Sequence, residues 1–167
     1  GVRNNEILRI EPHSNMNVNS HWMCDYGRLN YEHINNNRLL NPMIKSGSSL
    51  ENATWEDAVK KASSILNLHR PSQVLFIASA KASNEDNYLF SKFVRTIYKA
   101  SHINYIDYKN EDFADTKLKT NDKAPNTLGM LEIDKGITPI KWAEVKSKVK
   151  SGEIKVIYVF DNSIAND

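Results

Sequence analysis

The fold is decided by two apolar runs that flank a loop and a helix, and the first run is Val74-Leu75-Phe76-Ile77-Ala78. A run without polar interruptions is typical of a strand that is covered on both faces of a parallel sheet. The small residues 79–83 predict a loop, residues 84–99 predict a helix, and 103–107 predict the second strand. Together they predict a βαβ unit, whose crossover should be right-handed.

Two amphipathic helices are expected around this first strand. The earlier one begins at Thr54, whose hydroxyl can accept a hydrogen bond from an amide of the first turn. Its apolar residues recur at steps of three and four, which predicts one buried stripe: Trp55, Ala58, Val59, Ala62, Ile65 and Leu66. In the helix over 84–99, the residues expected to face the sheet are Leu89, Phe93 and Ile97, with Phe90 and Val94 beside them.

The remaining sequence continues the alternation of helix and strand. Residues 108–136 are polar and are expected to form a long loop, which in a compact domain is either functional or poorly ordered. Thr138-Pro139 predicts the start of a third helix that contains Trp142, Val145 and Val149. A third strand is expected over 154–160. The fold class is therefore α/β, with a doubly wound parallel sheet in a three-layer α/β/α arrangement over about 54–167, expected to be cut short at its end.

The first fifty residues have a different pattern. Residues 1–12 predict a short hairpin segment with a turn-prone Asn4-Asn5 pair, ended by Pro12. A tight turn is expected around Cys24, where Gly27 is a candidate for a positive φ. A short strand over 43–45 and a turn over 46–49 lead to a domain boundary at about 48–53.

Composition excludes several classes of function. The chain has 167 residues, of which 40% are hydrophobic and 25% charged, as in ordinary globular proteins. Its net charge of +2 is too small to indicate nucleic-acid binding. There is no apolar run long enough to insert directly into a membrane. The single cysteine excludes an internal disulfide, and the five histidines have no metal-ligand spacing.

The flanks of Cys24 resemble the iron–sulfur domain of the molybdopterin-oxidoreductase superfamily. In that family a segment of the form "RIxPxxNxxVNxxxxCDxGR" carries the fourth cysteine of a [4Fe-4S] cluster, and "RLxxPLIR" follows it. The matching residues here are Arg9-Ile10, Pro12, Asn15, Val18-Asn19, Cys24-Asp25, Gly27-Arg28, Arg38-Leu39 and Pro42-Met43-Ile44. The resemblance implies that Cys24 is the fourth [4Fe-4S] ligand and that three clustered cysteines lie upstream of this chain. Residues 1–50 would then be the C-terminal part of a [4Fe-4S] cluster-binding domain. Asp25 and Arg28 either orient the loop through a salt bridge or are ordinary polar residues of a turn.

Within the superfamily, the chain most closely resembles the large G-type subunits of NADH-quinone oxidoreductase, respiratory complex I. Further matches are Ala53–Ala58, Ser79–Leu89, Ala124–Gly129 and Gly152–Val159, while Phe160-Asp161 stands where the family often has a small residue and glycine. The resemblance implies electron transfer from NADH through iron–sulfur clusters toward quinone. It also implies partner subunits in the peripheral arm of complex I, on the cytoplasmic side of the membrane. This chain alone is expected to be a catalytically inert fragment without a bound cofactor.

Two alternatives remain open. One is a fragment of a molybdopterin oxidoreductase such as a formate dehydrogenase, and the other is a structural scaffold whose cofactor site has decayed. The loop over 79–83 contains no glycine, which disfavours close approach of a diphosphate. The lysines of the long loop are expected to be scattered and hydrated, and so to bind phosphate weakly: Lys109, Lys117, Lys119, Lys123 and Lys135.

Overall fold

The computed structural model describes residues 1–161. The chain divides into two compact units, and each is described by itself. The cysteine unit comprises Gly1–Ala58 and Glu111–Asn121, and the sheet unit comprises Val59–Asn110 and Asp122–Asp167. Residues 111–121 therefore belong with the segment around Cys24, although the sheet unit encloses them in the sequence. No helix among the described residues is long and apolar enough to cross a membrane.

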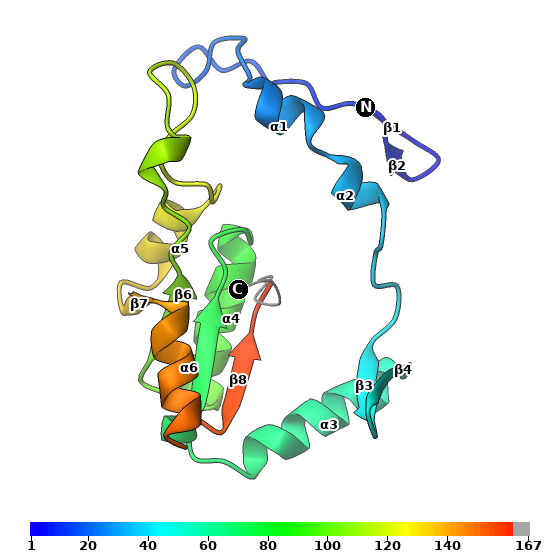
Figure 1. The fold of residues 1–167 in the computed structure, drawn as a ribbon, viewed down its shortest axis with the longest axis vertical. Helices are drawn as coiled ribbons and strands as arrows, with labels where there is room; N and C mark the ends of the chain where they lie inside the picture. The colour runs from blue at the N-terminus through cyan, green and yellow to red at the C-terminus, as the bar shows by residue number, and fades with distance from the viewer. Residues whose placement is uncertain (162–167) are drawn as a thin grey trace. The chain divides into compact units, whose positions relative to one another are not determined.

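The sheet unit is built on four parallel strands in the order β7-β6-β5-β8 (Figure 1). In chain order these are β5 (Val74–Ala78), β6 (Ile103–Ile106), β7 (Ile137–Ile140) and β8 (Val156–Val159). All five residues of β5 are buried, as the apolar run predicts for a strand with a neighbour on each side. Phe76 pairs with Ile103 of β6 and with Tyr158 of β8, so it lies in the middle of the sheet.

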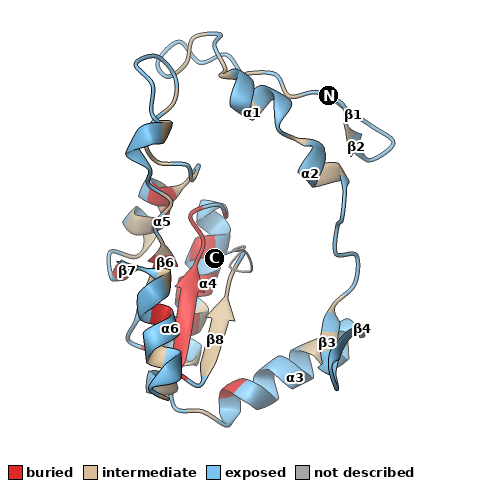
Figure 2. Ribbon diagram, viewed as in Figure 1, coloured by how far each residue is buried: buried red, intermediate tan, exposed pale blue. Residues whose placement is uncertain are grey.

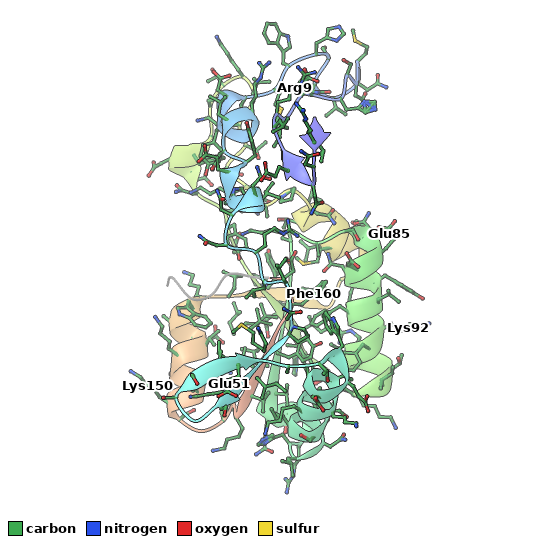
Figure 3. All side chains as sticks on the ribbon, turned by 90° about the vertical axis from the view of Figure 1, so that its right-hand side faces the viewer. Arg9, Glu51, Glu85, Lys92, Lys150 and Phe160 are labelled. Atoms are coloured by element: carbon green, nitrogen blue, oxygen red, sulfur yellow. The ribbon has the colours of Figure 1, made fainter. Side chains whose placement is uncertain are left out.

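Helix α3 (Trp55–Asn67) precedes β5. Three further helices connect the strands in turn, namely α4 (Asn84–Lys92), α5 (Thr127–Ile133) and α6 (Trp142–Lys150). The α4 helix continues as a π-helical turn over Phe93–Ile97 (η2), and shorter 3-10 turns cover Pro71–Gln73 (η1) and Glu111–Phe113 (η3). In Figure 3, Glu85 and Lys92 mark the first turn and the last residue of α4, and both side chains are exposed.

Alternate residues of β5 enter two separate clusters of buried side chains. Phe76 belongs to a cluster with Phe90 of α4 and Met130 of α5. Ile77 belongs to the other cluster, with Val145 of α6. Because successive strand side chains point to opposite faces, α4 and α5 pack on one face of β5 and α6 packs on the other. Figure 2 shows buried residues along β5 and on parts of these helices.

The ends of α4 and α5 are joined by a half-buried ion pair. Arg95 donates to both carboxylate oxygens of Asp134, at 2.6 and 3.0 Å, and the hydroxyl of Ser91 donates to the same carboxylate. Burial acts to raise the pKa of Asp134, but these hydrogen bonds and one from the Gly136 amide outweigh it, so the pKa is lowered. This arrangement holds the carboxylate ionised and ties the two helices together.

Several expectations for the sheet unit were wrong. Thr138-Pro139 does not cap a helix but lies inside β7, and α6 begins later, after Lys141. Proline lacks an amide donor, and β7 tolerates it because this strand lies at the edge of the sheet and pairs only with β6. The long loop over 108–136 also contains α5, whose first residue, Thr127, follows directly on Asn126.

The apolar stripes of two helices also differ from the expected ones. In α4 and its π-helical turn, Phe90 and Val94 are buried, whereas Leu89 is 62% and Ile97 is 71% exposed. The buried face includes the polar Asn87, which a stripe drawn from apolar residues alone does not include. Along α3 only Leu66 is buried, and Trp55 is 75% exposed.

The cysteine unit consists of short elements. A hairpin joins β1 (Val2–Arg3) to β2 (Glu6–Ile7) through Asn4 and Asn5, both at positive φ, as the turn-prone pair predicts. Two short helices follow, α1 (Asp25–Leu29) and α2 (Glu32–Asn35). The expected strand over 43–45 is β3 (Met43–Ser46), and it pairs with an unexpected strand, β4 (Ser49–Asn52). None of the described residues of this unit is buried.

Candidate functional site

Cys24 is the residue that precedes α1, and its thiol is free and half-buried. It faces a hollow of about 600 Å³, all of whose lining residues belong to the cysteine unit. The lining residues are Pro12, His21, Trp22, Met23, Cys24, Asp25, Tyr26, Arg28, Asp115, Lys117, Leu118 and Lys119. The sequence pattern placed Cys24, Asp25 and Arg28 near one another, but it did not predict that residues 115–119 would join them.

Gly27 has a different role from the expected one. It lies within α1 and is absent from the glycines with positive φ, so its conformation is accessible to other residues. A Cβ at this position would lie 3.4 Å from Cε of Met23 and 3.8 Å from Sγ of Cys24. The missing side chain therefore leaves room beside the sulfur, and a larger residue would occupy the space next to the thiol.

Charged side chains of both signs surround this hollow. Arg28, Lys117 and Lys119 carry positive charge, whereas Asp25 and Asp115 carry negative charge. No ion pair joins Asp25 to Arg28 in the described part of the chain, so of the two open interpretations the structure supports ordinary polar residues. His21 places Nδ1 3.0 Å from Oγ of Ser14. Within residues 1–161, no three His, Cys, Asp or Glu side chains are grouped to hold a metal ion, and Cys24 is the one cysteine of the sequence.

A second candidate site lies where β5 and β8 end. The strand order reverses between them, and in open α/β sheets ligands bind outside the carboxyl ends of strands at such a point. Here the hydroxyl of Ser79 donates to the carbonyl of Asp161 at 2.8 Å and accepts from the Lys81 amide at 3.1 Å. The Ala82 amide donates to the Ser79 carbonyl. The backbone amides of Lys81 and Ala82 are thus engaged within the turn itself.

Two asparagines bind the backbone carbonyls of the loop over 79–83. Buried Asn87 donates through Nδ2 to the carbonyls of Ser79 and Ser83, each at 3.0 Å, while its Oδ1 has no hydrogen-bond partner among the described residues. The backbone amide of Asn126 donates to the carbonyl of Ala80. Its side-chain Nδ2 donates to the carbonyl of Ala82 and to Oδ1 of Asn84, and all three distances are 2.9 Å. The sequence motifs over 79–89 and 124–129 are therefore in direct contact, which their separation in the chain does not reveal.

The residues at the end of β8 explain one departure from the expected pattern. Phe160 stacks on Phe90, with ring centroids 5.0 Å apart, and its amide donates to the carbonyl of Ile77. Asp161 follows with φ of +42°, in the left-handed region that favours glycine. Aspartate tolerates this conformation better than most residues, so the turn is kept without glycine.

Comparisons with known proteins give one family. The model of the molybdopterin oxidoreductase family matches residues 38–134. F420-dependent formate dehydrogenase 1 subunit alpha of Methanococcus maripaludis is 31% identical over 105 residues, which are 62% of this chain and 16% of the relative. The G-type subunit of NADH-quinone oxidoreductase from Rickettsia bellii is 25% identical over 161 residues, which are 92% of this chain and 24% of the relative.

The chain spans a quarter or less of the length of these relatives. The match to the Rickettsia bellii protein leaves only about 13 of the 167 residues uncovered, so it must include Cys24 wherever it begins. The family model, in contrast, begins after Cys24 and covers more than half of the chain. The motifs over 79–89 and 124–129, which the structure brings into contact, both lie inside the matched region. On these grounds the chain belongs to the molybdopterin oxidoreductase family.

Proposed function

We propose that this chain is part of an electron-transfer subunit of NADH-quinone oxidoreductase, and that Cys24 supplies one of four thiolates to a [4Fe-4S] cluster. The observation that carries the proposal is the setting of the thiol. It is free and half-buried, it faces a hollow lined by three cationic side chains, and Gly27 leaves space beside the sulfur. Such a cluster needs four ligands, so the other three would come from residues outside this chain.

The roles of this chain's own residues follow from their positions. Cys24 would hold one iron through its sulfur, and Gly27 would keep the space next to that sulfur open. Bound there, an iron–sulfur cluster would accept and pass on single electrons. Partner subunits of the peripheral arm, on the cytoplasmic face of the membrane, would complete the route from NADH to quinone. The match to the Rickettsia bellii G-type subunit over 92% of the chain supports this branch of the family.

For the sheet unit we propose a doubly wound, three-layer α/β/α domain without a working pterin or dinucleotide site. The two buried clusters, one with α4 and α5 and the other with α6, support the layers. The turn after β5 supports the absence of such a site, because the backbone amides of Lys81 and Ala82 donate within the turn and are not available to a phosphate.

The alternative is that this chain is part of a formate dehydrogenase that carries a pterin cofactor. It is favoured by the higher identity of the formate dehydrogenase relatives, which reaches 31% over 105 residues. In that case a ligand would be expected near the end of β5, where the Oδ1 atom of Asn87 is buried and has no partner among the described residues. Pterin content separates the two functions.

The test uses the longest natural protein that contains this chain. Wild type and Cys24→Ala are assayed for iron, molybdenum, tungsten and extractable pterin, with Ser20→Ala as a control outside the hollow. We expect the Cys24→Ala protein to lose about four iron atoms, the content of one cluster, while the control keeps them. Equal iron in all three proteins would refute the role of Cys24. Stoichiometric pterin in the wild type would favour the formate dehydrogenase alternative.

A further inference from the structure

Residues 111–121 form an excursion that lies between β6 and α5 in sequence but belongs to the cysteine unit in space. Lys109 and Asp122, which flank the excursion, form an isolated antiparallel β-bridge, so its two ends lie close together. Its aromatic residue, Phe113, packs edge-on against Tyr26 of α1, with ring centroids 5.4 Å apart. The segment is thus attached to the helix that Cys24 precedes.

One carboxylate fixes the shape of the excursion. Oδ1 of Asp115 accepts hydrogen bonds from the amides of Lys117, Leu118 and Lys119, at 2.8, 2.7 and 3.0 Å. The amide of Asp115 donates to the carbonyl of Lys119 and closes the turn. These bonds hold positions 117 to 119 along the wall of the Cys24 hollow.

The charges around the hollow do not cancel. Asp115 already receives three amide donors, which balance much of its negative charge locally. Of the other charged groups that line the hollow, Asp25 is negative, whereas the guanidinium of Arg28 and the ammonium groups of Lys117 and Lys119 are positive. Lys119 also lies 5.2 Å from the centroid of the Phe113 ring, so its position is coupled to the contact with Tyr26.

We propose that the excursion 111–121 is part of the cluster site, where Lys117 and Lys119 favour the reduced form of the cluster that Cys24 helps to hold. The proposal rests on the proposed function of Cys24. Reduction adds one negative charge, and nearby cations lower the energy of that charge. Lys117 and Lys119 are positioning residues in this scheme, because they set the potential of the site without ligating iron.

The experiment compares charge loss at two places in the same unit. The longest natural protein is prepared as wild type, as Lys117→Gln/Lys119→Gln, and as the control Arg3→Gln/Lys45→Gln. The control also loses two positive charges from the cysteine unit, but neither residue lines the hollow. The readout is the midpoint potential of the Cys24-dependent cluster, followed by electron paramagnetic resonance during a redox titration.

We expect the equilibrium constant for one-electron reduction to fall about tenfold in Lys117→Gln/Lys119→Gln, which corresponds to about 59 mV. The control should stay near the wild-type potential. The variant Lys117→Arg/Lys119→Arg keeps the charges and should also keep the potential. If both glutamine pairs shift the potential equally, or neither shifts it, the excursion has no specific effect and the inference is overturned.

The outcomes separate this inference from the proposed function. A wild-type protein without a Cys24-dependent cluster refutes the proposed function, and the inference falls with it. A cluster whose potential ignores Lys117 and Lys119 refutes the inference alone. If the glutamine pair loses its iron, the single variants Lys117→Gln and Lys119→Gln are titrated. A lowered potential in either one supports the inference, and unchanged potentials in both overturn it.

Discussion

The two units keep their shape by different means. The sheet unit contains all the buried residues of the described chain, and they form two clusters around β5. The cysteine unit buries none and exposes large apolar side chains such as Trp22, Leu39 and Leu40. Its order comes from polar contacts instead, for example those of Asn35 with both the backbone amide and the carbonyl of Ile7, at 2.8 Å each. Burial of apolar side chains gives cooperative stability, whereas an individual hydrogen bond has a small net contribution.

The largest contrast should appear in amide hydrogen exchange. We expect fast exchange before Ser49 and slow exchange at 74–78 and 156–160, because core strands open only on global unfolding. For a typical domain this costs about 5–15 kcal/mol, so the two sets should differ by several orders of magnitude in rate. The measurement is exchange followed by NMR or mass spectrometry. Equal protection in both units would refute the comparison.

Two alanine substitutions, one in each unit, should differ by several kcal/mol in their effect on the free energy of unfolding. Phe76→Ala removes a fully buried ring at the centre of the sheet and should lower the free energy of unfolding by about 3–5 kcal/mol. Leu39→Ala removes a side chain that is 83% exposed and should change it by less than about 0.5 kcal/mol. Urea unfolding measures both. Similar costs for the two variants would show that the cysteine unit buries Leu39 in solution.

The ion pair of the sheet unit should give a pH-dependent effect. Asp134→Asn should lower the free energy of unfolding at neutral pH by about 1.5–3 kcal/mol, because a charged hydrogen-bonding partner of Arg95 is lost. The pKa of Asp134 is lowered in the folded state, so its contribution is complete above the ordinary value of 3.8. It is lost as the pH falls through the lower, folded pKa. Unfolding of both proteins as a function of pH tests this, and a difference independent of pH would contradict it.

A smaller effect is expected at the contact between the two asparagine motifs. A Cβ at Gly129 would overlap Oδ1 of Asn126 and Oδ1 of Asn84, which are ends of side chains and can shift. Gly129→Ala should therefore cost about 1–2 kcal/mol. The neighbouring Leu128→Ala, at an exposed position of α5, is the matched control and should be nearly neutral. Equal stability of the two variants would mean that the amide contact does not contribute.

The smallest effect concerns the exposed turn of the cysteine unit. Three backbone amides lower the pKa of Asp115 to about 2, with the bond from Leu118 contributing most. The turn should therefore persist when the pH falls below 3.8 and loosen only as it falls through about 2. The carboxyl chemical shift of Asp115 reports this titration, and the amides of Lys117 and Lys119 should follow it. A midpoint at the ordinary value would show that the turn does not form in solution.

The sequence predicted the helices and strands that are determined by their own residues. The apolar runs located β5, β6 and β8, the start signal at Thr54 located α3, and the apolar residues from Trp142 onward located α6 despite the wrong start signal. Periodicity was less informative about orientation. The buried face of α4 includes Asn87, whose side-chain amide binds loop carbonyls, and a stripe drawn from apolar residues alone omits it.

The features that could not be predicted depend on contacts between residues that are distant in sequence. Pro139 is compatible with β7 only because that strand has one neighbour, which is a property of the whole sheet. The lysines of the long loop were expected to be scattered, yet Lys117 and Lys119 line one hollow with Cys24. The turn made by Asp115 was a local signal that could have been recognised, since aspartate commonly accepts from amides two to four residues later.

The position of β8 has a consequence for how the protein is made. β5 lies inside the sheet, but Ser79 and Asp161, which meet at the ends of β5 and β8, are 82 residues apart. A nascent chain that has emerged only as far as α6 has one side of β5 unpaired, with the hydrogen-bonding groups of an apolar strand exposed. Such an edge can pair with another chain, so it is a site for aggregation and for chaperone binding during synthesis. Termination of translation before Val156 would make this temporary edge permanent.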